Sequence, residues 1–390
     1  MQSLIPGTAA RTASAAELAV LMTSQRAQLL ALFDGFEATL PELKIGFDPL
    51  LNLPLWELGH IGWFEEFWLA RNPERARGAA ADPLAQRPAS AWDALYDSSA
   101  VAHATRWQLD LPDPAATRRY LAEVRVESLS LLARSGPEDD ALYFFRLALF
   151  HEAMHIEAWH VMAQHLGVDL GPAMSGRAPQ ASALMGEWQV PGGDRLIGSA
   201  GPGFAFDNEL GAHTQPVEAF SIDRAPVTWR RYLPSLNGHS LPKHLQHSDG
   251  GWQQRQFGRW QPLNLDAPAL HLSAHQAAAW CQWANRRLPT EVEWETAALL
   301  AASTGEAFDW GQAWEWTASP FAPYPGFSAH PYRDYSQPWF DDGRPVLRGA
   351  SFATSPSMRH PRYRNFFPAE RADVFAGFRS CAVWRGLMRR

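Results

Sequence analysis

Apolar residues in the first 165 positions recur with the period of an α-helix. In the segment that begins at Leu53, apolar side chains stand at positions 55, 58, 61, 64 and 68, close to one in every 3.6 residues. Pro54 suits the first turn of that helix, because a proline there loses no hydrogen bond, and Gly167 suits a helix end. The pattern predicts four long helices that pack as a bundle. They cover Ala15–Phe36, Leu53–Arg71, Thr117–Arg134 and Pro137–Gly167.

The pattern changes after position 165. Residues 166–186 contain several glycines and prolines and little periodicity, so they predict a linker. From position 187 to 390 short apolar stretches alternate with long loops, and Thr290 with Glu293 matches a helix capping box. The sequence therefore predicts an α+β protein with a helical domain over 1–165 and a second domain over 187–390. In the second domain we expect a hairpin of Glu187–Pro191 with Arg195–Gly198, strands at Val217–Ile222 and Val346–Gly349, and helices at Ser273–Asn285 and Thr290–Leu300.

Composition and charge exclude several classes of protein. Apolar residues make up 46% of the 390 residues and the net charge is only −7, so the chain is neither disordered nor basic enough to bind nucleic acid. No apolar run reaches the roughly 18 residues of a membrane span, and the N-terminus lacks a secretory signal pattern. Two cysteines exclude a disulfide scaffold. We expect a cytoplasmic protein, a monomer or a weak homodimer, without nucleic-acid or membrane partners.

The motif with the most chemistry is His151-Glu-Ala-Met-His155, on the fourth predicted helix. Its two histidines stand on one face of the helix, about 6 Å apart along the axis, which suits two ligands of one metal ion. Histidines at this spacing also occur as ordinary core or surface residues. His60 lies in an apolar helix between Gly59 and Gly62 and is the candidate third ligand, because bundle cores are common metal sites.

The same five residues match the H-E-x-x-H pattern of zinc metalloproteases, in which Glu152 would be the general base. The longer form of that pattern requires a glycine and a third histidine where this chain has Ala158 and Val161. No acidic residue on a downstream helix offers a third ligand instead. A zinc hydrolase and a non-catalytic binding module are the alternatives to a redox metal site. Glu157 lies about 200° around the helix from His155, so we expect it to be structural or to support the site without binding the metal.

Longer motifs in both halves resemble a known family. His60-Ile-Gly-Trp-Phe-Glu-Glu and the segment His151–Glu157 resemble the DinB-like helical bundle of the ergothioneine sulfoxide synthases and their sister group, the selenoneine synthases. The second half resembles the C-type-lectin-like fold of formylglycine-generating enzymes, although Cys281 and Cys381 are too far apart to be the reactive cysteine pair of those enzymes. The motifs of this second resemblance are Gly203–Glu209, Arg287–Trp294, Trp314–Thr317, Val346–Phe352, Tyr363–Phe367 and Gly377–Arg379.

The resemblance implies a function and a set of site residues. It implies an Fe(II) site held by His60, His151 and His155, and a reaction in which O₂ drives the joining of a selenium or sulfur donor to the imidazole C2 of hercynine (trimethylhistidine). Tyr332 matches the family's proton or hydrogen-atom donor. The other matched positions are Tyr335, Asn365, which implies a contact with hercynine, and Arg106, which implies a contact with the donor.

Three positions depart from the pattern of the sulfoxide synthases. Met154 replaces a glutamine before the last histidine ligand, and its sulfur cannot donate a hydrogen bond. Phe366 and Phe367 follow Asn365 where members that use γ-glutamylcysteine have a tryptophan and an aspartate. We expect these two rings to contact the trimethylammonium of hercynine. The apolar pocket favours an uncharged selenosugar as the donor. The sequence of Gly349–Phe352 resembles the selenoneine synthases and likewise favours selenoneine synthesis. Ergothioneine synthesis from cysteine or γ-glutamylcysteine is the alternative.

Overall fold

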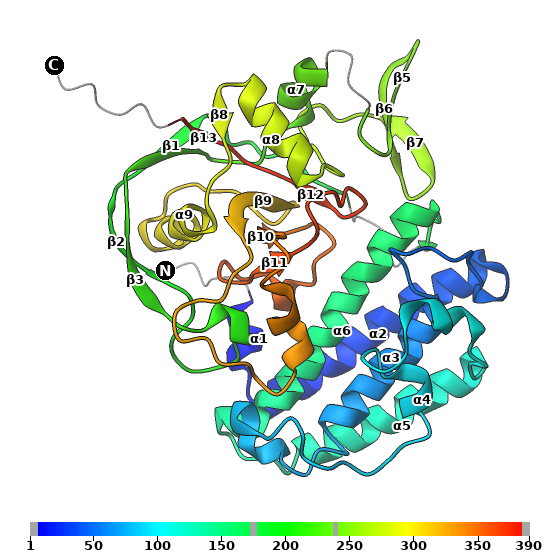
Figure 1. The fold of residues 1–390 in the computed structure, drawn as a ribbon. Helices are drawn as coiled ribbons and strands as arrows, with labels where there is room; N and C mark the ends of the chain where they lie inside the picture. The colour runs from blue at the N-terminus through cyan, green and yellow to red at the C-terminus, as the bar shows by residue number, and fades with distance from the viewer. Residues whose placement is uncertain (1–6, 172–177, 237–240, 384–390) are drawn as a thin grey trace.

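The structure is a computed structural model that describes residues 7–171, 178–236 and 241–383 (Figure 1). Within these ranges the chain is α+β, with a helical N-terminal region followed by a region of short strands. The four longest helices of the first region are α2, α3, α5 and α6, and each of them contacts the other three. The helices of this region are α1 (Thr8–Thr12), α2 (Ala15–Thr39), α3 (Pro54–Trp68), α4 (Asp93–Tyr96), α5 (Pro114–Leu132) and α6 (Asp139–Leu166).

Local sequence signals set the ends of the long helices. Ser14 and Glu17 form a capping box at the start of α2, and Pro54 occupies the first turn of α3. The side chain of Asp113 accepts a hydrogen bond from the backbone of Ala116 at the start of α5. Gly167 ends α6 in the left-handed conformation, with φ of 74°. The predicted helix positions are confirmed, and their ends shift by a few residues.

The long helices enclose buried charges as well as an apolar core. The carboxylate of Glu65 accepts hydrogen bonds from Arg26 at 2.7 Å and from Arg125 at 2.9 Å. Glu152 accepts from the same two arginines, at 2.7 and 2.8 Å. These four side chains are buried, and each carboxylate meets two guanidinium groups. The glutamate of the H-E-x-x-H motif is therefore directed into the helical core.

The second region builds small sheets around two longer helices. Its helices are α7 (Trp229–Tyr232), α8 (Ala274–Trp283) and α9 (Glu291–Thr304). One sheet has the order β1 (Glu187–Val190), β4 (Phe220–Asp223), β13 (Cys381–Ala382), β8 (Arg286–Arg287). Another has the order β11 (Asn365–Phe366), β10 (Pro345–Ala350), β9 (Ala313–Pro320), β12 (Ala376–Gly377). The remaining sheets pair β2 (Gly193–Ile197) with β3 (His213–Val217), and β5 (Leu245–Ser248) with β6 (Gly251–Gln256) and β7 (Arg259–Pro262).

The predicted hairpin of Glu187–Pro191 with Arg195–Gly198 is wrong. Strand β1 pairs with β4 and strand β2 pairs with β3, so the two predicted partners belong to different sheets. The reason is packing: Trp188 and Val190 of β1 are buried against residues of β4 and β13, far away in the sequence. The strand predicted over Val217–Ile222 is likewise two strands, since β3 ends at Val217 and β4 begins at Phe220.

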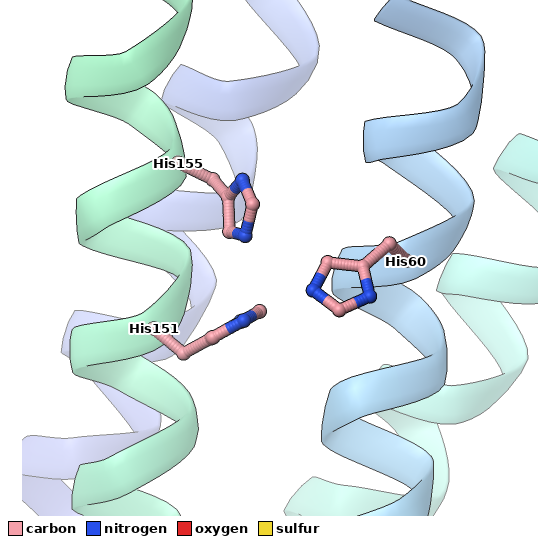
Figure 2. A group of neighbouring side chains, drawn as sticks. All are labelled: His60, His151 and His155. Carbon is pink, nitrogen blue, oxygen red and sulfur yellow. The ribbon is translucent and has the colours of Figure 1, made fainter. Parts of the chain in front are cut away.

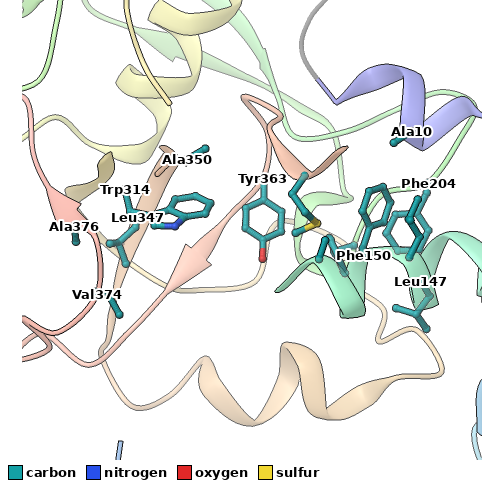
Figure 3. Packing of buried hydrophobic residues seen from close by; sticks show 14 of the residues in the cluster. Ala10, Leu147, Phe150, Phe204, Trp314, Leu347, Ala350, Tyr363, Val374 and Ala376 are labelled. Carbon is teal, nitrogen blue, oxygen red and sulfur yellow. The ribbon is translucent and has the colours of Figure 1, made fainter. Parts of the chain in front are cut away.

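The apolar core is continuous between the two regions. Phe150 of α6 packs against Phe204, with ring centroids 5.0 Å apart (Figure 3). The ring of Phe206 lies 5.9 Å from that of Phe150. At the N-terminus, the buried guanidinium of Arg11 forms an ion pair with the buried carboxylate of Glu209. The helical region therefore packs and pairs with the second region through both apolar and charged side chains.

The described residues also bear on the expectations drawn from composition. Cys281 and Cys381 are both buried free thiols, so no disulfide joins them. Among the helices within the described ranges, none combines the length and the apolar character that crossing a bilayer requires.

Candidate metal centre and adjoining cavity

Three histidine side chains meet between α3 and α6 (Figure 2). His60 comes from α3, while His151 and His155 come from successive turns of α6. One ring nitrogen of each histidine lies within 4.8 Å of a ring nitrogen of the other two. The ring centroids are 5.1 Å apart for His60 and His151, 5.2 Å for His60 and His155, and 4.6 Å for the α6 pair. Within the described ranges, this is the group of three His, Cys, Asp or Glu side chains close enough to share one ion.

The surroundings of His60 and His151 favour neutral, oriented rings. His60 Nδ1 donates a hydrogen bond to the carbonyl of Tyr96 at 2.8 Å, so its Nε2 keeps a lone pair for a metal. Burial and the neighbouring His155 lower the pKa of His60 to about 3, and burial lowers the pKa of His151. The ring of His151 lies flat on Phe64, with centroids 3.5 Å apart. Because metals bind neutral imidazole, the three residues fit a divalent metal ion.

The glycines that flank His60 allow close approach of neighbouring side chains. A Cβ atom at position 59 would lie 2.1 Å from the ring of Tyr96, so a larger residue would have to displace that ring. A Cβ at position 62 would lie 2.8 Å from Leu121 of α5. Gly59 and Gly62 therefore serve helix packing around the histidine.

A chain of polar contacts leads from His155 to Arg106. Glu57 Oε1 lies 3.4 Å from His155 Nδ1 and accepts a hydrogen bond from Asn52 at 3.1 Å. Asn52 Oδ1 in turn accepts from Arg106 at 2.7 Å, and the guanidinium of Arg106 stacks on Trp56, 3.9 Å from the ring centroid. Arg106 was expected at the donor site, but it is absent from the cavity lining described below, because Asn52 stands between it and Glu57.

Tyr332 reaches the histidines from the second region. Its ring centroid is 6.5 Å from that of His151, 5.0 Å from Phe64 and 6.0 Å from Trp68. Burial raises the pKa of the Tyr332 hydroxyl well above its usual value of 10. The phenol therefore keeps its proton at physiological pH and lies beside the histidine group.

A cavity of about 340 Å³ begins at His155 and extends between the two regions. Arg371 is the one cationic side chain among its described lining residues, and its guanidinium pairs with Asp373 and lies 5.2 Å from the Phe367 ring. A volume of this size is in the range of small-molecule sites. The residues predicted for the site that line it are Met154, His155, Tyr335, Asn365, Phe366 and Phe367. The other lining residues are Leu50, Leu51, Asn52, Glu57, Ala153, Glu157, Ala158, Val161, Met162, Trp314, Met358, Tyr363, Arg371, Val374 and Phe375.

Hydrogen bonds and stacking fix several of these walls. The Tyr335 hydroxyl donates to the Tyr363 hydroxyl at 2.9 Å, and Tyr363 donates to the sulfur of Met154 at 3.6 Å. Phe366 stacks on Phe321, with centroids 3.9 Å apart. Asn365 lines the cavity, and its Oδ1 accepts a hydrogen bond from the backbone of Phe366 at 2.9 Å.

Four residues of the site were not predicted from the sequence to bind a substrate or a metal. Glu57 precedes His60 by one helical turn, and this spacing could have placed it beside the histidine. Asn52 and Arg371 lie in loops without a motif. Glu157, expected to be structural, lines the cavity and accepts hydrogen bonds from the side chains of Ser351, Thr354 and Trp314 of the second region.

Comparisons with known proteins agree with this architecture. Residues 174–313 match the family of the sulfatase-modifying factor enzyme 1-like domain. The chain is 32% identical to the hercynine oxygenase of Mycobacterium tuberculosis, with 93% of this chain and 98% of that protein covered. It is also 32% identical to the hercynine oxygenase of Mycolicibacterium smegmatis, with 95% and 98% covered. The ergothioneine biosynthesis protein 1 of Schizosaccharomyces pombe is 27% identical over 45% of this chain and 27% of its own length. The chain thus belongs to the hercynine oxygenase family of oxidative enzymes.

Proposed function

We propose that this protein is a non-heme Fe(II) enzyme that uses O₂ to couple hercynine to a selenosugar, with a new C–Se bond at the imidazole C2. The proposal assigns residues 1–165 to a DinB-like bundle, 166–186 to a linker and 187–390 to a C-type-lectin-like domain. One observation carries it: three clustered histidines, of which His60 and His151 are buried and neutral, open through His155 into a cavity of about 340 Å³ with aromatic walls.

His60, His151 and His155 would hold the iron. Three neutral nitrogen ligands leave coordination positions for O₂ and for a substrate atom. When bound, Fe(II) would allow O₂ to act as the oxidant and would provide a binding position for the selenium or sulfur of the donor. The zinc hydrolase alternative lacks support, because Glu152, its general base, is held by Arg26 and Arg125. In such hydrolases that glutamate must reach the water on the metal.

The cavity lining supports a zwitterionic betaine such as hercynine as the first substrate. A quaternary ammonium cannot be neutralised, so aromatic faces are its natural partners, and Phe366 and Phe367 offer them. Arg371 is paired with Asp373 through Nε and Nη2, and its other N–H groups would bind the carboxylate at the other end of the molecule. The side-chain amide of Asn365 adds a neutral hydrogen-bond donor between these groups. Together these residues would orient the imidazole towards His155.

Tyr332 would hold the proton that moves during coupling. Its hydroxyl keeps this proton because burial raises its pKa, and its ring lies beside His151. The coupling removes one hydrogen from C2 and one from the selenol, which are two electrons and two protons that O₂ accepts. A selenoxide product with one water would balance all four electrons that O₂ can take.

The donor pocket favours an uncharged sugar. Phe366 and Phe367 present rings where a carboxylate would pair with the ammonium of a dipeptide, and an unpaired ammonium in such surroundings costs several kcal/mol. The second candidate is C–S bond formation from cysteine or γ-glutamylcysteine. The carboxylate of Glu57 in the cavity lining favours this candidate, because it offers an ammonium a partner.

Competition between donors tests the proposal. The Fe(II)-loaded enzyme is incubated in air with hercynine and equal amounts of a selenosugar, cysteine and γ-glutamylcysteine, and the products are identified by mass. We expect almost all product to carry the selenosugar. Phe367→Asp should shift the preference towards γ-glutamylcysteine. Efficient use of the dipeptide by the wild type would assign the enzyme to ergothioneine synthesis, and no product from hercynine with any donor would refute the function.

A further inference from the structure

The cavity contains one carboxylate whose bonding is incomplete. Glu57 is 4% exposed, lies on α3 one turn before His60, and lines the cavity next to His155. Its Oε1 accepts a hydrogen bond from Asn52 at 3.1 Å and lies 3.4 Å from His155 Nδ1. Its Oε2 is buried and has no hydrogen-bond partner among the described residues. Glu57 is thus a buried carboxylate with unused acceptor capacity, on a residue that lines the metal end of the cavity.

The hydrogen bonding of Glu57 differs from that of Glu157, the other carboxylate of the cavity. Glu157 lines the same cavity, yet its two oxygens accept hydrogen bonds from Ser351, Thr354 and Trp314. Buried carboxylates without partners are costly, and native proteins satisfy nearly all of them. Arg106, the cation nearest to Glu57 along the chain of polar contacts, is separated from it by Asn52. A bound molecule that supplies an O–H or N–H group would complete the bonding of Glu57.

The chemistry of the two substrates decides which of them supplies that group. The trimethylammonium of hercynine carries no N–H, and its carboxylate would be repelled by Glu57 and attracted by Arg371, on the second region. A selenosugar carries several hydroxyls close to its selenium. Because Glu57 adjoins His155, a hydroxyl bound there would keep the selenium near the histidine group.

We propose that Glu57 is the specificity residue for the chalcogen donor, whose hydroxyl donates a hydrogen bond to the Glu57 carboxylate. This inference rests on the proposed function, since it assumes a hydroxyl-bearing donor beside the three histidines. It assigns the hydroxyls of the donor to the α3 side of the cavity and the carboxylate of hercynine to the side of Arg371.

Glu57→Gln tests the assignment with little change of shape. Calorimetry without O₂ first measures the Kd of Fe(II) for the full chain. The Fe(II)-loaded chain then gives the Kd of hercynine and that of 1-thioglucose, a stable thiol analogue of the selenosugar. A lost hydrogen bond to a charged group predicts a roughly 10- to 100-fold weaker Kd for 1-thioglucose. The Kd values of Fe(II) and hercynine should change less than about twofold. Glu66→Gln is the matched control, because Glu66 lies on the same helix and accepts from Tyr120 outside the cavity.

Three outcomes would overturn the assignment. Unchanged binding of 1-thioglucose would show that Glu57 does not contact the donor, as would failure of the wild type to bind it. Weaker binding of hercynine alone would place hercynine at Glu57. Loss of Fe(II) together with both substrates would make Glu57 a support of His155 only. Turnover of the wild type is measured separately. If Glu57→Gln weakens the binding of 1-thioglucose but the wild type forms no product, the proposed reaction is refuted while the contact between Glu57 and the donor is supported.

Discussion

His155 takes part in two environments at once. It is one of the three clustered imidazoles, and it is also the member of that group that lines the cavity. His60 and His151 lie behind it, stacked on Trp56 and Phe64 respectively. A substitution at position 155 is therefore expected to disturb metal and substrate together, whereas substitutions at the other two positions act on the metal first.

Replacing any one of His60, His151 and His155 by alanine should remove bound iron and activity. Two remaining nitrogens hold a divalent ion far more weakly than three, so we expect Fe(II) affinity to fall by at least about 100-fold. Anaerobic titration with Fe(II) and metal analysis after gel filtration measure the effect. His275→Ala is the control, since His275 is exposed. Full iron content in His60→Ala would contradict the triad.

Tyr332→Phe isolates the role of one hydroxyl. The ring contacts with Phe64 and Trp68 are retained, while the proton of the hydroxyl is lost. General-acid groups contribute about 10² to 10⁴ in rate, so kcat with hercynine should fall by at least about 100-fold while Fe(II) binds as in the wild type. A variant with wild-type kcat would remove Tyr332 from the mechanism.

At the scale of elements, α6 connects the metal group to the second region. Phe150 packs against Phe204, His151 and His155 face α3, and Glu157 receives hydrogen bonds from the second region. Near its end, Gln164 accepts a hydrogen bond from the backbone of Phe257 at 2.7 Å. Because one rigid helix makes all these contacts, the position of the two α6 histidines is tied to the packing between the regions.

Glu157 provides the test at this scale. Glu157→Ala leaves the hydroxyls of Ser351 and Thr354 and the Trp314 N–H without their acceptor, so we expect a loss of about 3 kcal/mol in the free energy of unfolding. Glu157→Gln keeps one acceptor oxygen, and the expected loss is about 1 kcal/mol. Urea unfolding followed by circular dichroism gives both values. Equal stability of the two variants would mean that these bonds contribute little.

The contrast between the helices and the sheets shows how far the sequence alone leads. Helix positions follow from spacing within a few turns, so Pro54 and Gly167 could be interpreted directly. The pairing of β1 with β4 depends on the burial of Trp188 against residues more than thirty positions away, which no local pattern contains. Asn52 and Arg371 were not predicted for the same reason, because only the fold brings their loops to the cavity.

The whole molecule buries several histidines outside the metal group in the neutral state. Burial lowers the pKa of His271 and of His330 to about 4 and that of His244 to about 3. Unfolded histidine titrates near pH 6.5. Because the unfolded chain binds more protons in this range, their contribution to stability is complete above pH 6.5 and is lost as the pH falls towards 4.

The expected result is a free energy of unfolding that declines on acidification from pH 7 to pH 4. His271→Asn should make this decline shallower, because asparagine does not titrate and tolerates the positive φ of 58° at this position. Urea unfolding at pH 7 and pH 5 measures the difference between the two proteins. The exposed His275→Asn should leave the decline unchanged. An identical decline in His271→Asn would exclude His271 as a source.

The ion pair between Arg11 and Glu209 has a consequence for the order of synthesis on the ribosome. Arg11 emerges early, and its partner follows 198 residues later. The hydroxyl donors to Glu157 come later still, with Ser351 and Thr354. The helical half is thus translated long before Arg11 meets its ion-pair partner and Glu157 meets its hydrogen-bond donors. A nascent chain would carry three histidines but no closed cavity, so the enzyme acquires a shielded reaction chamber only when translation is nearly complete.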